Sequence, residues 1–173
     1  MSRPILDVLF LCTGNTARSV LAEGLLHHLG AGRFHAYSAG SQPKGVVNPF
    51  ALETLAAHGC PTDGLRSKSW NELAGPGAPH MDFIFTVCDN AAGETCPYWP
   101  GRPLSAHWGI ADPAAVEGTD EAKRQAFEMA WLQLRERIQA FLALPINALP
   151  PDDLARRLAG IGRMAGATME NGD

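Results

Sequence analysis

Residues 12–19 read CTGNTARS and directly follow the apolar run ILDVLFL at 5–11. A short apolar run is typical of a buried strand, and residues 19–29 predict a helix with Leu25 and Leu29 available to face a core. The residues between them must therefore form a loop that joins a strand to a helix. Backbone N–H groups in such a loop, together with the positive end of the following helix, bind tetrahedral oxyanions.

A cysteine and an arginine stand at the two ends of this loop, in the pattern CX5R. Arg18 carries a planar fork of donors that matches the oxygens of an anion in pairs. The positive surroundings should lower the pKa of Cys12, which we expect to be a thiolate nucleophile beneath the bound anion. The alternative is an inert buried cysteine and a surface arginine. It leaves unexplained why strand, glycine, arginine and helix start fall in one register.

The other loop residues are predicted to shape the anion site. Gly14 permits backbone conformations that a side chain would forbid, and Asn15 tolerates a left-handed conformation or bonds across the loop. Ser19 can give its hydroxyl hydrogen to the thiolate. The predicted oxyanion-binding residues are Thr13, Gly14, Asn15, Thr16, Ala17, Arg18 and Ser19.

Length and composition indicate one soluble globular domain without a broad charged face. The chain has 173 residues, of which 46% are hydrophobic and 18% charged, with a net charge of −4. This charge argues against nucleic acid or an anionic membrane as a partner. The first apolar stretch is short and interrupted by Asp7, so it is neither a signal peptide nor a membrane span. We therefore expect a cytoplasmic protein, whose four cysteines are reduced, catalytic or metal-binding.

Strands and helices are predicted to alternate along the chain, which indicates an α/β fold with a parallel sheet, doubly wound, with helices on both faces. Active sites in such folds lie beyond the carboxyl ends of the strands, where Cys12 is placed. The phosphate-binding and dinucleotide-binding glycine patterns are absent, and with them the usual signatures of ATP and NAD. We expect one domain over residues 1–145 and an extension over 146–173, a short helix and then a disordered end. Further strands are predicted at 34–39, 81–87 and 103–107, and helices at 48–59, 69–73, 119–142 and 152–161.

Asp112 precedes a proline in a predicted loop between the last strand and the long helix. Trp108 and Ile110 could desolvate it, and a carboxyl group near an anion and apolar neighbours can retain its proton and act as a general acid. On its own, however, the Asp-Pro pair is only a turn signal.

Cys88 closes the third predicted strand, and Cys96 follows eight positions later. In a doubly wound sheet the end of the third strand lies beside the end of the first, so we expect Cys88 near Cys12. In a helix the two later cysteines would be about 12 Å apart, whereas a disulfide needs roughly 4.4–6.8 Å between Cα atoms. A redox switch would therefore require residues 89–97 to change conformation. Two unrelated buried thiols are one alternative. A zinc site with His107 is another, but the spacing matches no common finger.

Three motifs taken together resemble the cytosolic arsenate reductases built on the low-molecular-weight protein tyrosine phosphatase fold. They are CTGNTARS, TVCDNAAGETCP at 86–97 and HWGIADP at 107–113, and the resemblance covers residues 5–142. It implies a four-stranded parallel sheet flanked by helices, a phosphotyrosine protein phosphatase I-like domain. The roles that it implies are nucleophile for Cys12, oxyanion clamp for Arg18, general acid for Asp112, and redox relay for Cys88 and Cys96.

The resemblance implies reduction of arsenate to arsenite with no metal or organic cofactor, and with phosphate or sulfate as competing oxyanions. A relay disulfide would be reduced by thioredoxin or glutaredoxin, and the sequence leaves that choice open. Ala17 stands where many relatives have a second loop cysteine. The runner-up is a low-molecular-weight tyrosine phosphatase-type phosphomonoesterase, but Ala114 and Ala115 stand where phosphotyrosine-specific relatives carry aromatic residues. A non-enzymatic oxyanion-binding module would leave Cys12 or Asp112 unused.

Overall fold

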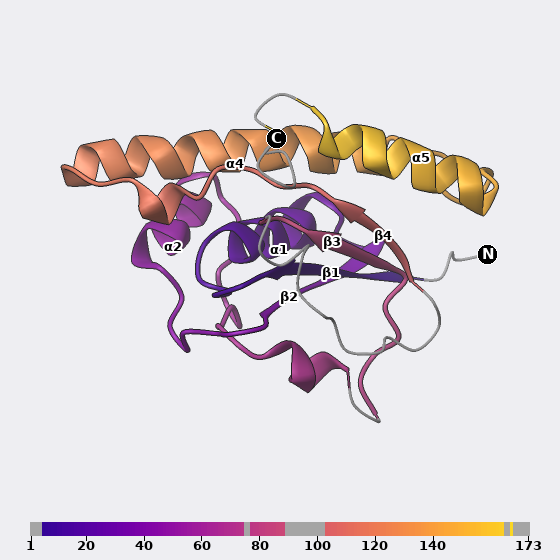
Figure 1. Ribbon diagram of the computed structural model, residues 1–173, viewed down its shortest axis with the longest axis horizontal. Helices are drawn as coiled ribbons and strands as arrows, with labels where there is room; N and C mark the ends of the chain where they lie inside the picture. The colour runs from indigo at the N-terminus through magenta and orange to yellow at the C-terminus, as the bar shows by residue number, and fades with distance from the viewer. Residues whose placement is uncertain (1–4, 75–76, 89–102, 165–166, 168–173) are drawn as a thin grey trace.

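The computed structural model describes residues 5–74, 77–88, 103–164 and 167. Its centre is a four-stranded parallel sheet with strand order β2-β1-β3-β4 (Figure 1). This arrangement confirms the predicted α/β fold, and each strand lies close to its predicted position. The strands are β1 (Leu6–Cys12), β2 (Phe34–Gly40), β3 (Phe83–Thr86) and β4 (Leu104–His107).

The helices also follow the sequence prediction. Asn48 caps α2 by accepting the Phe50 N–H, and Thr119 caps α4 by accepting the Ala122 N–H. Asparagine and threonine are both common N-cap residues. One short element, η2, was predicted only as a turn. The helices are α1 (Arg18–Leu29), α2 (Pro49–Ala57), η1 (Trp70–Leu73), η2 (Pro113–Ala115), α4 (Asp120–Leu142) and α5 (Pro151–Gly162).

The central strand β1 is buried on both of its faces, which explains its continuous apolar sequence. Val8 and Phe10 face the main core with residues of α1, α2, α4 and α5. Leu9 and Leu11 face a smaller core that Trp70 and Leu73 of η1 cover. Figure 1 shows α4 and α5 along one side of the sheet and the short helix η1 on the opposite side. The two faces of β1 are therefore covered by different parts of the chain.

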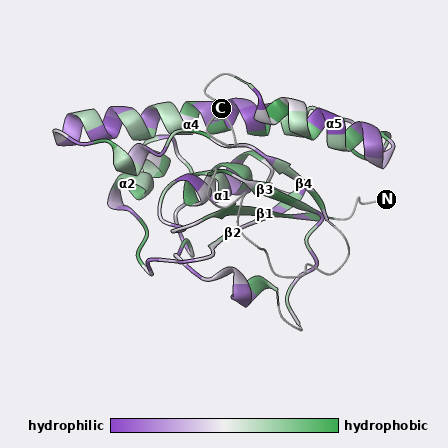
Figure 2. Cartoon of the chain, in the orientation of Figure 1, coloured by the Kyte–Doolittle hydropathy of each residue, from purple (hydrophilic) through white to green (hydrophobic). Residues whose placement is uncertain are grey.

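The prediction for the core face of α1 needs one correction. Leu29 is 37% exposed, whereas Leu26 is fully buried. The helix is buried over most of its length, because it packs against β2, α4 and α2, so its last turn alone reaches the surface. By contrast, the outer helices α4 and α5 alternate between hydrophobic and hydrophilic residues (Figure 2), as expected for helices with one face on a core.

The helix predicted near 152–161 is α5, and it packs against β4. The Trp108 indole N–H donates to the Leu158 carbonyl over 3.0 Å, and Leu158 is fully buried. Gly162 lies against β4 so closely that an added Cβ would stand 2.1 Å from the His107 carbonyl oxygen. The division of the chain at residue 145 stays a prediction. Within the ranges described above, no helix has the length and apolar character needed to cross a membrane.

We predict that Gly162→Ala lowers the free energy of unfolding by roughly 1–3 kcal/mol, because helix and strand backbones must separate to admit the methyl group. Gly160→Ala is the matched control in the same helix, since nothing lies within 4 Å of its added Cβ. It should be neutral or stabilising by up to about 1 kcal/mol. Denaturant unfolding of both variants measures the difference. Equal stabilities would contradict the close packing of α5 on β4.

Candidate active site

The ends of three neighbouring strands meet at the site. Cys12 is the last residue of β1 and is paired with Gly40 of β2, while Leu11 is paired with Thr86 of β3. Because parallel strands all end at the same edge, the loops that follow them are brought together there. The loop after β1 leads directly into α1, whose N-cap is Ala17, a residue with no side-chain acceptor. The first N–H groups of α1 are thus left for another acceptor, such as an anion.

Cys12 is only 5% exposed, and its sulfur lies among hydrogen-bond donors of the loop and of α1. It is 3.0 Å from the Ser19 hydroxyl oxygen and accepts the Asn15 N–H over 3.2 Å. Asn15 has a φ of +48°, the left-handed conformation expected for it. Gly14 does not have a left-handed φ, and a Cβ there would meet only the Lys44 side chain, at 3.6 Å. The strained position of the loop is therefore Asn15 and not Gly14.

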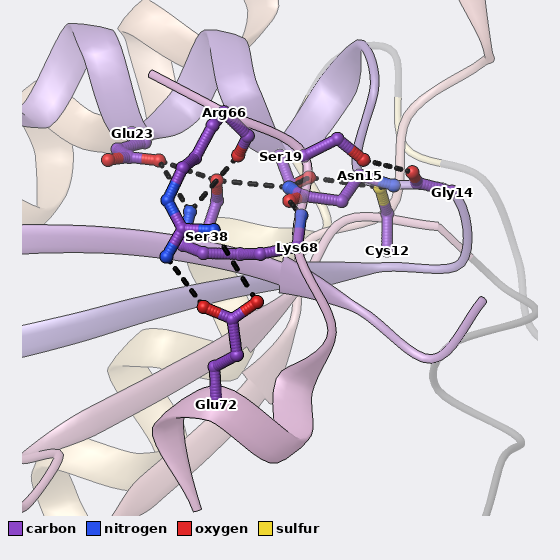
Figure 3. A network of polar contacts seen from close by, with 10 residues as sticks. Cys12, Gly14, Asn15, Ser19, Glu23, Ser38, Arg66, Lys68 and Glu72 are labelled. Carbon is purple, nitrogen blue, oxygen red and sulfur yellow. Dashed lines mark hydrogen bonds and ion pairs between the residues drawn. The ribbon is translucent and has the colours of Figure 1, made fainter. Parts of the chain in front are cut away.

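The Asn15 amide connects the loop to the interior of the domain (Figure 3). Its Nδ2 group donates to the Ser19 hydroxyl over 2.8 Å and to the Ser38 hydroxyl over 3.0 Å. Its Oδ1 atom accepts the Lys68 backbone N–H over 2.9 Å. Ser38 in turn donates to Glu23 over 2.5 Å. A fully buried side chain with all of these contacts holds the loop in one conformation.

Arg18 and Asp112 close the other side of the site. The Arg18 Nη1 group donates to the Ile110 carbonyl over 2.9 Å, and Nη2 lies 3.6 Å from Asp112 Oδ2. These contacts join residues far apart in the sequence. A surface cavity of about 250 Å³, large enough for a small oxyanion, lies between these residues and the loop after β1. The cavity is lined by Cys12, Thr13, Gly14, Thr16, Ala17, Arg18, Gln42, Lys44, Asp112 and Ala114.

The expected desolvation of Asp112 by its neighbours is wrong. Trp108 and Ile110 are both fully buried in the main core, where the Trp108 ring stacks on Phe85 at 3.8 Å between centroids. The side chain of Asp112 is 38% exposed and also accepts the Ala114 N–H over 2.9 Å, as the cap of η2. The carboxyl group of Asp112 is positioned by this cap and by Arg18.

Cys88 is brought to Cys12 by the pairing of β3 with β1, as expected for the end of the third strand. It is 2% exposed, lies 3.7 Å from the Thr13 hydroxyl, and is close enough to Cys12 to raise the pKa of that thiol. The other predicted relay cysteine, Cys96, lies outside the described residues, as does the segment 89–97. Cys60 is buried against Trp131, away from the cavity, in keeping with a structural role.

The expected lowering of the Cys12 pKa is also wrong for this arrangement of thiols. The hydrogen bond with Cys88 and burial raise the pKa of Cys12, against the lowering effect of Ser19. The donors around Cys12 are local in the sequence, whereas the tertiary structure adds a second acidic group, the Cys88 thiol. Two adjacent thiols cannot both ionise readily, so they titrate as a pair.

Two cavity residues were missed in the sequence. Gln42 and Lys44 come from the loop after β2, and the Lys44 N–H donates to the Gly14 carbonyl over 3.1 Å. The signal was present, because β2 was expected in the same parallel sheet and its following loop must reach the same edge. Over the described ranges there is no group of three or more His, Cys, Asp or Glu side chains that could hold a metal ion.

Comparison with known proteins agrees with this geometry. The sequence pattern of the family "Low molecular weight phosphotyrosine protein phosphatase" matches residues 7–149. An arsenate reductase of Bacillus licheniformis is 37% identical over 136 residues, covering 78% of this chain and 93% of the relative. The chain therefore belongs to the low-molecular-weight phosphotyrosine protein phosphatase family.

Solved structures give the same fold. An arsenate reductase in its phosphate-binding state has a TM-score of 0.65 and 25% identity, covering 80% of this chain and 98% of that one. A thioredoxin-dependent arsenate reductase of Corynebacterium glutamicum has a TM-score of 0.54 and 26% identity. That match covers 80% of this chain but only 64% of the Corynebacterium protein.

We predict that Cys88→Ser lowers the pH at which Cys12 becomes reactive, because the largest cause of its raised pKa is removed. At a fixed pH below the titration midpoint of Cys12, a larger fraction of Cys12 is then thiolate in Cys88→Ser than in the parent. The rate of Cys12 alkylation by iodoacetamide, followed against pH by mass spectrometry, measures this. Cys60→Ser should leave the midpoint in place. A midpoint that is unchanged or higher in Cys88→Ser would contradict the coupling of the two thiols.

Proposed function

We propose that the protein is an arsenate reductase that converts arsenate to arsenite for arsenic detoxification. The position of Cys88 beside Cys12, just past the paired ends of β3 and β1, carries this proposal, because a second thiol beside the nucleophile is needed for reduction and not for ester hydrolysis. The names of its relatives support it, including the Bacillus licheniformis and Corynebacterium glutamicum arsenate reductases. The proposed site comprises Cys12, Arg18, Asp112, Cys88 and Cys96, with residues 13–19 binding the oxyanion.

The first chemical step joins Cys12 to arsenic. The Cys12 sulfur attacks arsenate held by the loop N–H groups and by Arg18, and an As–O bond breaks as Asp112 protonates the departing oxygen. Water leaves, and arsenic is still As(V) in the cysteine adduct. Because the pKa of Cys12 is raised, its proton needs an acceptor, and an oxygen of the bound arsenate dianion supplies one.

The second step is the reduction. Cys88 attacks the Cys12 sulfur, the S–As bond breaks, and its electron pair stays on arsenic, which leaves as arsenite, As(III). Two thiol sulfurs are thereby oxidised to a Cys12–Cys88 disulfide. Cys96 then attacks Cys88, which releases Cys12 and gives a Cys88–Cys96 disulfide. A cytoplasmic thiol partner, thioredoxin or glutaredoxin, reduces this disulfide, and the thioredoxin dependence of the Corynebacterium protein favours the first.

The competing proposal is a phosphomonoesterase, which requires only Cys12, Arg18 and Asp112. Those three do lie together in the cavity. The cavity residue that follows the Asp-Pro pair is Ala114, which offers no aromatic face on which a phosphotyrosine ring can stack. Reduction therefore uses more of the observed arrangement than ester hydrolysis does.

Arsenate-dependent consumption of NADPH, with thioredoxin and glutaredoxin systems supplied separately, tests the proposal. We expect turnover in the parent, none in Cys12→Ser, and none in Cys88→Ser. Cys88→Ser should still hydrolyse a small aryl phosphate at any slow rate that the parent shows, because water replaces the second thiol. Cys60→Ser is the matched control and should be fully active. Parent-like turnover in Cys88→Ser would rule out the relay and indicate direct attack of an external thiol on the adduct.

Asp112→Asn should slow arsenate reduction less than it slows hydrolysis of an alkyl phosphate. General acids contribute about 10²–10⁴-fold, and arsenate oxygens already carry protons near neutral pH, so we expect the low end for arsenate. The kcat values of the variant on the two substrates give the comparison. Equal losses on both would indicate that Asp112 acts only by holding Arg18 and the loop.

A further inference from the structure

A buried ion pair lies behind the oxyanion loop, outside the residues that line the cavity. Lys68 is 8% exposed, and its Nζ group is 3.9 Å from Glu23 Oε1 and donates to the Arg66 carbonyl over 3.1 Å. In Figure 3, Glu23 lies on the side of Ser19 and Asn15 that is away from Cys12. A buried charge pair is a weak source of stability, because desolvation offsets most of its attraction. Its place at the end of the Asn15 network indicates another role.

The hydrogen bonds from Glu23 to Cys12 run in one direction. Both Nδ2 hydrogens of Asn15 are used, one on the Ser19 hydroxyl and one on the Ser38 hydroxyl. Ser19 therefore accepts from Asn15, and its own hydrogen is left for the Cys12 sulfur, 3.0 Å away. Ser38 likewise accepts from Asn15 and sends its hydrogen to Glu23. An ionised Glu23 favours this order, because a carboxylate only accepts hydrogen bonds, whereas a protonated carboxyl group also has a hydrogen to donate.

We propose that Glu23 and Lys68 are positioning residues that keep the Ser19 hydroxyl donating to the Cys12 sulfur. The ionised Glu23 takes the Ser38 hydrogen, which fixes the Asn15 amide with its NH₂ group toward both hydroxyls. A protonated Glu23 has an O–H that competes for the Ser38 oxygen, and a Ser38 hydrogen turned away from Glu23 meets the Asn15 NH₂ group. Either change weakens the hold on the amide, which the Lys68 backbone N–H then supports alone. The inference rests on the proposed nucleophilic role of Cys12.

The charges that face Glu23 indicate that Lys68 keeps it ionised. Burial raises the pKa of Glu23, and Lys68 is the first of the groups that lower it, before Ser38, His27 and Arg66. Arg66 is itself paired with Glu72 over 2.6 Å near the surface. Without Lys68, the rise in the pKa of Glu23 that burial causes is opposed only by groups with smaller effects.

The surroundings of Lys68 are consistent with this assignment. Burial lowers the pKa of Lys68, and the negative charge of Glu23 raises it. Smaller effects come from Arg66, which lowers this pKa, and from Glu72, which raises it. Each member of the pair therefore favours the charged form of the other. Loss of either member should weaken the Ser19 hydrogen bond and leave Cys12 ionising at higher pH.

Alkylation of Cys12 by iodoacetamide, followed against pH by mass spectrometry in the full-length Cys88→Ser chain, tests the proposal. We expect Lys68→Met to raise the midpoint by about one pH unit and Lys68→Arg to restore it. Ser38→Ala interrupts the same chain without removing a charge and should also raise the midpoint. Added to Lys68→Met, it should cause little further change, because both act through one path. Lys123→Met on α4, which also removes one charge, is the control and should leave the midpoint unchanged.

Circular dichroism shows whether the Lys68→Met chain is folded. If it is folded and its alkylation midpoint equals that of the Cys88→Ser chain, the proposal is overturned. If Lys68→Met does not fold, Ser38→Ala decides, and an unchanged midpoint in that variant overturns it equally. Arsenate plays no part in the measurement. Absence of arsenate turnover in the parent would therefore refute the proposed function without affecting this result, and the reverse also holds.

Discussion

The parallel pairing of β1 with β2 on one side and β3 on the other is the constraint on which the site depends. It sets Cys12 beside Gly40 and brings Cys88, just past β3, into contact with Cys12. The approach of β2 to the loop is so close that a Cβ at Gly40 would lie 2.4 Å from the Thr13 carbonyl oxygen. The oxyanion loop is thus defined by neighbouring backbone as much as by its own sequence.

Hydrogen bonds in the polar interior next to the oxyanion loop also fix the conformation of that loop. Asn15 adopts a left-handed conformation that only a few residue types tolerate, and its buried side-chain amide has three hydrogen-bond partners at once. The fourth contact is its backbone N–H on the Cys12 sulfur. Since an unpaired buried amide is costly, the network has one satisfied arrangement, and that arrangement points the Ser19 hydroxyl at the Cys12 sulfur. Stability of the loop and orientation of the donor are therefore the same physical requirement.

The chemistry of the family can be divided between two parts of this framework. In the proposed mechanism, Cys12, Arg18 and Asp112 form and stabilise a covalent adduct with a tetrahedral oxyanion. A thiol at the end of β3 changes what happens to that adduct, because sulfur can attack sulfur where water would attack phosphorus. The same thiol raises the pKa of Cys12, the residue that it attacks in the proposed second step. The raised pKa is a direct physical consequence of holding a second thiol close enough to react.

Local sequence determined much of this protein. The apolar runs, the caps at Asn48 and Thr119 and the CX5R loop each depend on residues within a few positions of one another, so they can be read without a structure. Even the approach of Cys88 to Cys12 follows from strand order. Other properties depend on which distant groups share a low-dielectric space. The burial of Trp108 away from Asp112, the place of Lys44 at the cavity and the Lys68–Glu23 pair behind Asn15 belong to this class. Only the tertiary structure decides these, because burial and charge act through space and not along the chain.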